Sequence, residues 1–200
     1  MSSRQRVETA LAHRQPDRTP VDFLAVPEIW HQLVDHFGIE PAKPCDDQFF
    51  DPVWEAVLDK RDVDCRVISF DQFCAPPASA FAPKGRPEVW NVQSRSTPAR
   101  MWRWKTDGFA TDVFGRGFRE VANASGVYEE NIATLAGAST LAEIQAHTWP
   151  DPDWWDFSSA KSVVEALNRT GAPHIRFRMG TAFELAWQMR GKEKFLMELA

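Results

Sequence analysis

The sequence has few cysteines and no excess of positive charge. Its three cysteines, Cys45, Cys65 and Cys74, form no Cys-x-x-Cys pair and leave at least one unpaired, so they do not indicate a disulfide framework. A formal net charge of −5 argues against nucleic-acid binding, which needs basic patches. No apolar run is long enough to span a membrane, and the polar, arginine-containing N-terminus is unlike a secretory signal. We expect a cytoplasmic protein with reduced thiols that binds neither nucleic acid nor a membrane.

Tyrosine is also nearly absent, whereas the other aromatic residues are abundant. The chain has one Tyr but nine Trp and 14 Phe. Trp102 and Trp104 fall on one face of an expected β-strand. Such residues build either the core of a small β-rich segment, which we favour, or a platform that binds sugars and other flat ligands. The tryptophans concerned are Trp90, Trp102, Trp104, Trp149, Trp154 and Trp155.

Three short apolar runs alternate with amphipathic helical patterns. The expected strands cover 21–26, 62–70 and 174–179, and helical segments flank each of them. The helices begin at prolines or at Ser, Thr and Asp caps, as at Asp51-Pro52 and in the Thr140–Glu143 capping box. Strands that alternate with helices are typical of an α/β protein with a parallel sheet.

The region between the second and third expected strands has a different pattern. Residues 72–98 are rich in Pro and Ala and predict an irregular loop. From 101 to 132 the apolar residues alternate, and Asp107-Gly108 is a hairpin turn signal. We therefore expect a small antiparallel β insertion at about 72–157.

The N-terminal stretch resembles a known superfamily. Ser3 and Val7 with an arginine between them, Ala10-Leu11-x-His13, and Pro16-Asp17-Arg18-x-Pro20-Val21 are similar to the opening of the uroporphyrinogen decarboxylase superfamily. This superfamily includes porphyrinogen decarboxylases and corrinoid-linked methyltransferases. The resemblance implies a (β/α)8 barrel, which typically needs about 250 residues. With 200 residues, the chain is expected to form the N-terminal half of such a barrel. Further segments are similar to the family: Asp64-x-Arg66, Asp112-x-Phe114-Gly115, Gly126-x-Tyr128, Trp149-Pro-Asp-Pro152 and Arg190-Gly191-x-Glu193-x-Phe195-Leu196.

In a barrel the active site lies at the carboxyl ends of the strands. Asp71 follows the second expected strand and is the predicted catalytic residue, because decarboxylases of the family place a carboxylate beneath the tetrapyrrole after a strand that ends in Phe-Ser-Asp. Here the preceding pair is inverted to Ser69-Phe70, and Asp71 could instead begin a solvated loop. The predicted substrate-binding residues are Asp22, Phe23, Thr181 and Phe183.

The family resemblance leaves two enzyme classes open. The decarboxylases carry an arginine-rich phrase after the first strand to hold substrate carboxylates, whereas this chain has Leu24-Ala-Val-Pro-Glu28. We therefore favour methyl transfer between a small methylated substrate, a corrinoid protein and an acceptor. Porphyrinogen decarboxylation is the alternative, and a Trp-lined binding module or an inactive fragment is the non-enzymatic one.

No cofactor is expected to bind to this segment by itself. The methyltransferase branch holds zinc through a His-x-Cys pair and a later Cys, and no His-x-Cys occurs here. Zinc ligands would therefore lie after residue 200, and the corrinoid would be carried by a partner protein. The apolar face of Phe195, Leu196 and Leu199 also predicts a homodimer or a further segment that covers it.

Overall fold

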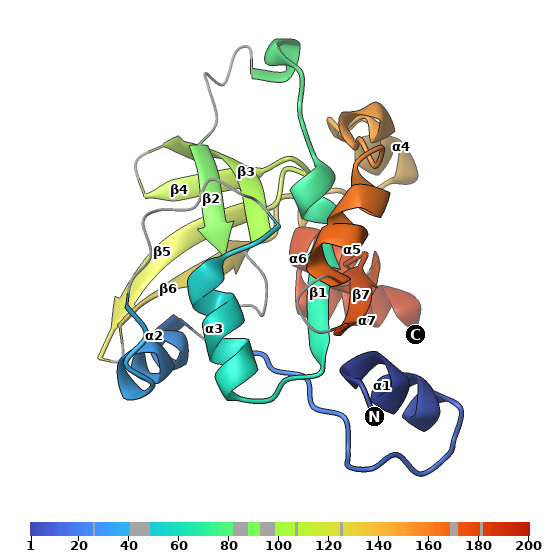
Figure 1. Cartoon of the computed structure of the whole chain (residues 1–200). Coiled ribbons are helices and arrows are strands. Elements are labelled where there is room, and N and C mark those ends of the chain that lie inside the picture. The colour runs from blue at the N-terminus through green and yellow to red at the C-terminus, as the bar shows by residue number, and fades with distance from the viewer. Residues whose placement is uncertain are drawn as a thin grey trace. The chain divides into compact units, whose positions relative to one another are not determined.

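The chain is a mixed α/β protein with a parallel and an antiparallel sheet (Figure 1). The computed structural model describes residues 1–25, 27–40, 49–81, 88–92, 99–106, 108–124, 126–168, 172–180 and 182–200. It divides into two compact units. The first comprises Met1–Phe73, Asn91–Arg100 and Asp156–Met179, and the second comprises Cys74–Trp90, Met101–Trp155 and Gly180–Ala200. The mixed α/β class predicted from the sequence is confirmed.

The parallel sheet of the first unit consists of β1 and β7. Cys65 of β1 lies opposite His174 of β7, and Ser69 lies opposite Arg178, so the two strands run in the same direction without a register shift. All five residues of β1 are buried, as expected for a strand inside a parallel sheet. The elements of this unit are α1 (Ser3–Leu11), α2 (Pro27–His36), α3 (Pro52–Lys60), β1 (Cys65–Ser69), the 3₁₀ helix η1 (Phe70–Phe73), α5 (Ala160–Asn168) and β7 (His174–Arg178).

The strand predicted over residues 21–26 is not formed. Residues 21–25 have no regular strand geometry, Leu24 is exposed, and Val26 lies outside the described residues. In the described chain, the backbone of this segment bonds to the residue before β1 at Val21, whose carbonyl accepts the Asp64 N–H at 2.8 Å. A strand needs partners along its whole length for its backbone groups, and here the pairing is confined to the first residue.

The amino ends of the three predicted strands nevertheless lie side by side. Asp64 immediately precedes β1, and its N–H donates to Val21 while its carbonyl accepts the His174 N–H at 2.8 Å. The segment at Val21, β1 and β7 therefore follow one another in the order in which they occur along the chain, with β1 in the middle.

Helices α2 and α3 form the hydrophobic core of the first unit. Trp30 of α2 is fully buried, and its ring centroid lies 4.4 Å from that of Trp54 of α3. The cap at Asp51 is confirmed, because its carboxylate accepts the N–H groups of Val53 and Trp54. The core cluster is completed by Val57, Leu58 and Val63.

The guanidinium of Arg66 joins β1 to α3. Its Nε lies 2.6 Å from Glu55 and its Nη2 lies 2.8 Å from Asp59, both on α3. Since side chains alternate along a strand, Arg66 and Ile68 lie on the face that meets α3. Cys65, Val67 and Ser69, with their partners on β7, lie on the opposite face.

The antiparallel sheet has the strand order β2-β3-β4-β5-β6. The prediction of an irregular loop over 72–98 was wrong in part, because β2 and a short 3₁₀ helix, η2 (Ala78–Phe81), lie within it. The pattern of β2 is only five residues long and lies between Pro-rich stretches, so the sequence does not identify it as a strand. It becomes a strand through its pairing with β3. The strands are β2 (Glu88–Val92), β3 (Ala99–Thr106), β4 (Phe109–Asp112), β5 (Gly117–Asn123) and β6 (Gly126–Ile132).

The predicted hairpin between β3 and β4 is confirmed by its register. Thr106 pairs with Phe109, which leaves a two-residue loop, and Gly108 has φ +69°, as such loops require. Asp107 lies outside the described residues.

Helical segments complete the second unit. The capping box is confirmed, because Thr140 Oγ1 accepts the Glu143 N–H and Glu143 accepts the Thr140 N–H. In the part of the chain that the structure describes, no helix is long and apolar enough to cross a membrane, and the strands do not close a barrel. These segments are α4 (Leu141–Gln145), the 3₁₀ helix η3 (Pro152–Trp154), α6 (Ala182–Arg190) and α7 (Lys192–Leu199).

Candidate functional site

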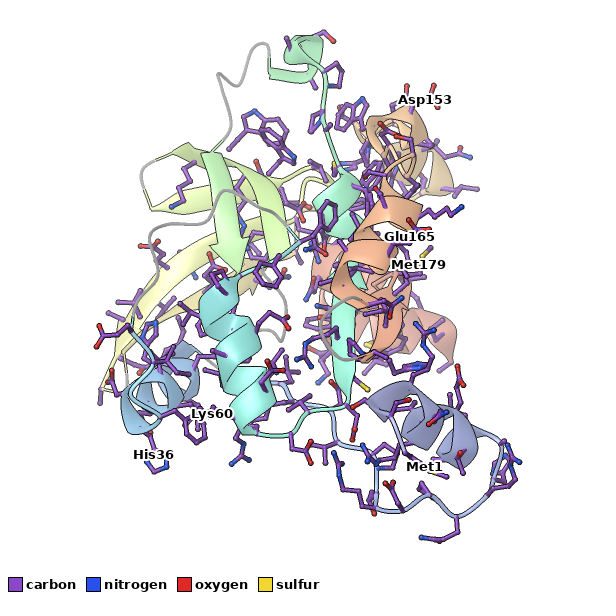
Figure 2. All side chains as sticks on the ribbon, viewed as in Figure 1. Met1, His36, Lys60, Asp153, Glu165 and Met179 are labelled. Atoms are coloured by element: carbon purple, nitrogen blue, oxygen red, sulfur yellow. The ribbon has the colours of Figure 1, made fainter. Side chains whose placement is uncertain are left out.

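Polar side chains gather where the two parallel strands end. Because Ser69 lies opposite Arg178, the carboxyl ends of β1 and β7 meet at one edge. Residues opposite each other in a sheet point to the same face, so Ser69 and Arg178 share the face turned away from Arg66. Asp71 follows two residues after Ser69, and Met179 leaves β7 at the same end (Figure 2). We call Ser69, Asp71 and Arg178 the strand-end cluster.

Asp71 is held in place by the residues around it. The chain turns into η1 after β1, and Ser69 Oγ donates a hydrogen bond of 3.0 Å to Asp71 Oδ2. The Ser69 N–H donates to Gln72 Oε1 at 2.6 Å, and Gln72 is only 2 % exposed. Sequence reasoning identified Asp71 but missed Gln72. The signal that could have identified Gln72 was its position beside Asp71, between Phe70 and Phe73 and directly after a buried strand.

Asp22 lies nearer the middle of the parallel pair. Its carboxylate forms an ion pair with Arg176, which lies opposite Val67 of β1. Asp22 was expected to lie beside Asp71 at the strand ends. It is instead bound to Arg176, two residues before the end of β7. Burial raises the pKa of the Cys65 thiol, and the negative charge of Asp22 raises it further. Cys65 is thus kept as a neutral thiol, which makes it a poor nucleophile.

The other three predicted substrate-binding residues have different surroundings. Phe23 packs edge-on against Trp30, with ring centroids 5.1 Å apart, and so contributes to the core of α2 and α3. Phe183 lies in the second unit, is 55 % exposed, and packs edge-on against Phe195 with ring centroids 5.3 Å apart. Thr181 lies outside the described residues.

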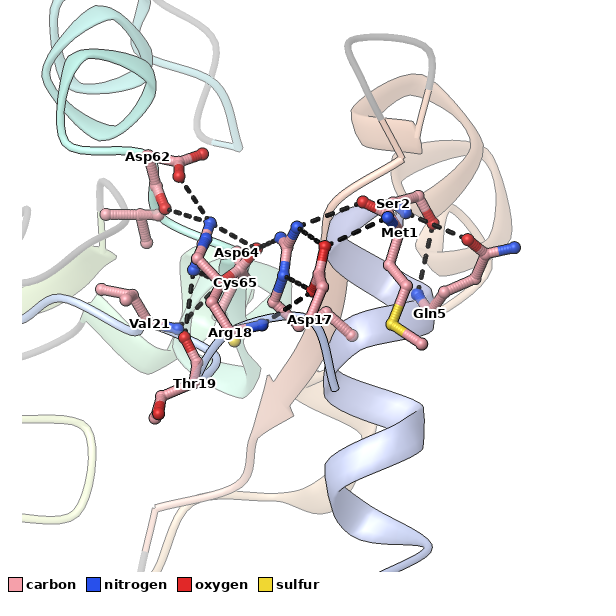
Figure 3. Close-up of polar contacts among 12 residues, drawn as sticks. Met1, Ser2, Gln5, Asp17, Arg18, Thr19, Val21, Asp62, Asp64 and Cys65 are labelled. Carbon is pink, nitrogen blue, oxygen red and sulfur yellow. Dashed lines mark hydrogen bonds and ion pairs between the residues drawn. The ribbon is translucent and has the colours of Figure 1, made fainter. Parts of the chain in front are cut away.

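A buried ion-pair network surrounds Asp64 (Figure 3). Its carboxylate, which has no exposed surface, contacts Arg6 at 2.5 Å and Arg18 at 2.6 Å and accepts the Val21 N–H at 2.8 Å. Asp17 in turn binds Arg6 at 2.7 Å. The Asp17-Arg18 pair of the N-terminal motif therefore fastens the turn to the amino end of β1, a structural role.

The motif Asp112-x-Phe114-Gly115 also forms a structural turn. Buried Asp112 accepts the N–H groups of Phe114 and Arg116, at 3.0 and 2.9 Å. Gly115 has φ +77°, and a Cβ at this position would lie 2.7 Å from the ring of His147. The His147 Nε2 lies 2.8 Å from the Phe114 carbonyl, so the turn and the loop after α4 are packed together without space for a side chain.

The tryptophans of β3 take part in packing. Trp104 is 7 % exposed, and the indole N–H of Trp102 donates to the Cys74 carbonyl at 2.7 Å. A cavity of about 270 Å³ opens on the antiparallel sheet, but phenylalanines and charged residues line it. Its lining residues are Lys105, Gly108, Phe109, Ala110, Phe118, Glu120 and Glu129.

In the described ranges, no group of three or more His, Cys, Asp or Glu side chains is arranged so that it could hold a metal ion. No protein-family model, curated protein or solved structure matches the chain. The resemblance to the uroporphyrinogen decarboxylase superfamily therefore rests on the sequence motifs themselves.

Proposed function

We propose that the chain is a methyltransferase of the uroporphyrinogen decarboxylase superfamily, which moves a methyl group from a small methylated substrate to a corrinoid carried by a partner protein. The observation that carries the proposal is the position of Asp71. A carboxylate fixed by Ser69 follows the carboxyl end of β1, beside the end of the parallel strand β7. Ligands of parallel α/β proteins bind at this end of the strands.

The proposal also specifies the type of α/β fold. We propose that β1 and β7 are neighbouring strands of a (β/α)8 barrel, with the segment at Val21 as the preceding one. Support comes from the order of the three segments, which are bonded at their amino ends in chain order. Further support comes from α3, which packs through Glu55 on the Arg66 face of β1, as a helix of the outer ring would.

The strand-end cluster suits a substrate with a cationic methylated nitrogen. Asp71 supplies a negative charge next to that nitrogen, and Ser69 Oγ keeps the carboxylate oriented, while Gln72 accepts the Ser69 N–H. A reduced corrinoid on the partner protein would accept the methyl group as a formal methyl cation, and the bonding electron pair would stay on the substrate nitrogen. Because the nitrogen loses its positive charge as the methyl group leaves, Asp71 assists the transfer by binding and orienting the substrate, and not by stabilising charge in the transition state. The described residues do not offer the ligand set that zinc requires.

Porphyrinogen decarboxylation is less well supported by these residues. A tetrapyrrole with many carboxylates needs several arginines. On this face of the parallel pair Arg176 is already bound to Asp22, which leaves Arg178 as the arginine at the strand ends.

Methyl transfer is tested by mixing the protein with a reduced corrinoid and a panel of small N-methylated compounds with and without a carboxylate, and by following methylation of the corrinoid in its absorbance spectrum. We expect turnover by the wild-type protein and a loss of about 100-fold or more in kcat/KM in Asp71→Asn, on the order of the effect of misplacing a reacting group. Asp153→Asn, at an exposed position of η3 (Figure 2), is the matched control. Conversion of uroporphyrinogen by the wild-type protein would contradict the methyltransferase assignment.

A further inference from the structure

Arg178 stands out among the arginines of the parallel pair. Arg66 of β1 is bound to Glu55 and Asp59, and Arg176 of β7 is bound to Asp22. Arg178 is half-buried, yet within the described ranges no carboxylate lies in ion-pair distance of its guanidinium. Partial burial of a cation without a counter-ion is unfavourable, so this position is suited to a negative group supplied by a ligand.

The position of Arg178 links it to the proposed reaction site. Arg178 lies opposite Ser69, and Ser69 Oγ holds Asp71. The ends of two adjacent strands therefore present a positive charge on β7 and a negative charge after β1. A ligand bound between them would need both signs of charge.

We propose that Arg178 anchors the carboxylate of a zwitterionic substrate, a small N-methylated amino acid whose ammonium group faces Asp71. This inference rests on the proposed methyl transfer and names the substrate class. The planar guanidinium can bind both oxygens of a carboxylate at once, which fixes the orientation of the methylated nitrogen. A simple amine would leave Arg178 without a partner, and a polyacid would place further carboxylates against Asp71.

Substrate specificity follows from the same two charges. A pocket that is built for a charged group rejects an analogue without it, because its own buried charge is then left uncompensated. Arg178 is thus a specificity-determining residue, and Asp71 remains the predicted catalytic one.

Binding measurements without any corrinoid test this inference separately from the methyl transfer. The probe is N,N-dimethylglycine, titrated into the 200-residue chain and followed by calorimetry. Trimethylammonium lacks the carboxylate, and acetate and inorganic phosphate lack the ammonium group. We expect dimethylglycine to bind at least tenfold more tightly than any of the three, which corresponds to one charge-assisted interaction.

Variants test whether the substrate carboxylate binds to Arg178. Arg178→Gln is expected to weaken dimethylglycine at least tenfold and to leave trimethylammonium unchanged, whereas Arg178→Lys keeps the charge and recovers part of the affinity. Arg119→Gln is the matched control, because Arg119 is an exposed strand arginine paired with Glu130. Circular dichroism and thermal unfolding are the controls that check whether each variant is folded.

Three results would overturn the inference: no binding of dimethylglycine, equal binding of acetate or phosphate, or an unchanged affinity in Arg178→Gln. If dimethylglycine binds as expected but no methyl group reaches a corrinoid, the proposed function fails while the substrate site stands.

Discussion

The guanidinium of Arg18 lies 2.6 Å from the carboxylate of Asp64, which has no exposed surface. Arg6 contacts the same carboxylate from the other side, and the Val21 N–H completes its hydrogen bonding. A buried carboxylate with two arginines is stable only while all partners remain. The N-terminal turn, β1 and β7 therefore depend on one side chain and its backbone groups.

Asp64→Asn should destabilise the first unit by about 3 kcal/mol, because it leaves the charges of Arg6 and Arg18 next to a neutral amide. Urea unfolding followed by tryptophan fluorescence measures the change. Asp62→Asn is the control, since Asp62 also pairs with Arg18 but its side chain is 80 % exposed. Its effect should stay within about 0.5 kcal/mol; equal effects of the two variants would contradict a special role for the buried carboxylate.

The network also predicts a loss of stability in acid. Burial works to raise the pKa of Asp64, but hydrogen bonds from Val21, Ser3 and the two arginines outweigh it and lower the pKa below its usual value. The hydrogen bond from Arg6 likewise lowers the pKa of Asp17. Carboxylates with a depressed folded-state pKa stabilise the protein above the unfolded pKa, about 3.9, and this contribution is lost as the pH falls towards the folded value.

The free energy of unfolding, measured between pH 7 and pH 2.5, should therefore fall as the pH drops below about 4. In Asp64→Asn the fall should be shallower, because one of the titrating groups is gone. A wild-type curve that is flat across this range, or one that Asp64→Asn leaves unchanged, would contradict the assigned shifts.

Gly115→Ala should destabilise the second unit more than Gly108→Ala. Both positions have positive φ, which costs about 1 kcal/mol for a residue with a Cβ, but only at Gly115 would the Cβ meet the His147 ring. We expect about 1 kcal/mol for Gly108→Ala and about 2 kcal/mol or more for Gly115→Ala. Replacing His147 with Ala in the Gly115→Ala protein should recover the difference, and thermal unfolding of the four proteins checks it.

Arg190→Gln should loosen the segment 133–138. Arg190 Nη1 donates to the carbonyls of Leu135 and Ala138, and its Nε donates to Glu198. The Leu135 amide, which donates to the Met189 carbonyl, should then exchange its hydrogen at least tenfold faster, in line with a lower local opening free energy. Exchange followed by NMR measures this rate, and an equal acceleration in Arg119→Gln would show that the effect is not specific.

The elements that local chemistry determines could be predicted from the sequence. Asp51-Pro52 starts α3, Gly38 follows α2, and Thr140 with Glu143 opens α4, because each depends on residues a few positions apart. The hairpin at Gly108 belongs to the same group. The strand at 21–26 was predicted from an apolar pattern alone, but a strand also needs neighbours, and these depend on distant parts of the chain.

The site shows the same limit. Asp71 could be identified because it directly follows a buried strand. The ion pair of Asp22 with Arg176 and the packing of Phe23 on Trp30 join residues far apart in sequence. The absence of a carboxylate beside Arg178, in the part of the chain that the structure describes, likewise depends on distant segments. No local pattern specifies such pairs, so they required the structure.

The backbone of Asp64 bridges Val21 and His174, and this has a consequence for the order of folding. The chain between Asp64 and His174 contains the antiparallel strands, whose hairpins close over short loops such as the one between Thr106 and Phe109. Short loops close in microseconds, whereas the entropic cost of closure grows with loop length. We expect the hairpins to form first and to shorten the effective loop between β1 and β7, so a variant that weakens the hairpins should slow the formation of the parallel pair.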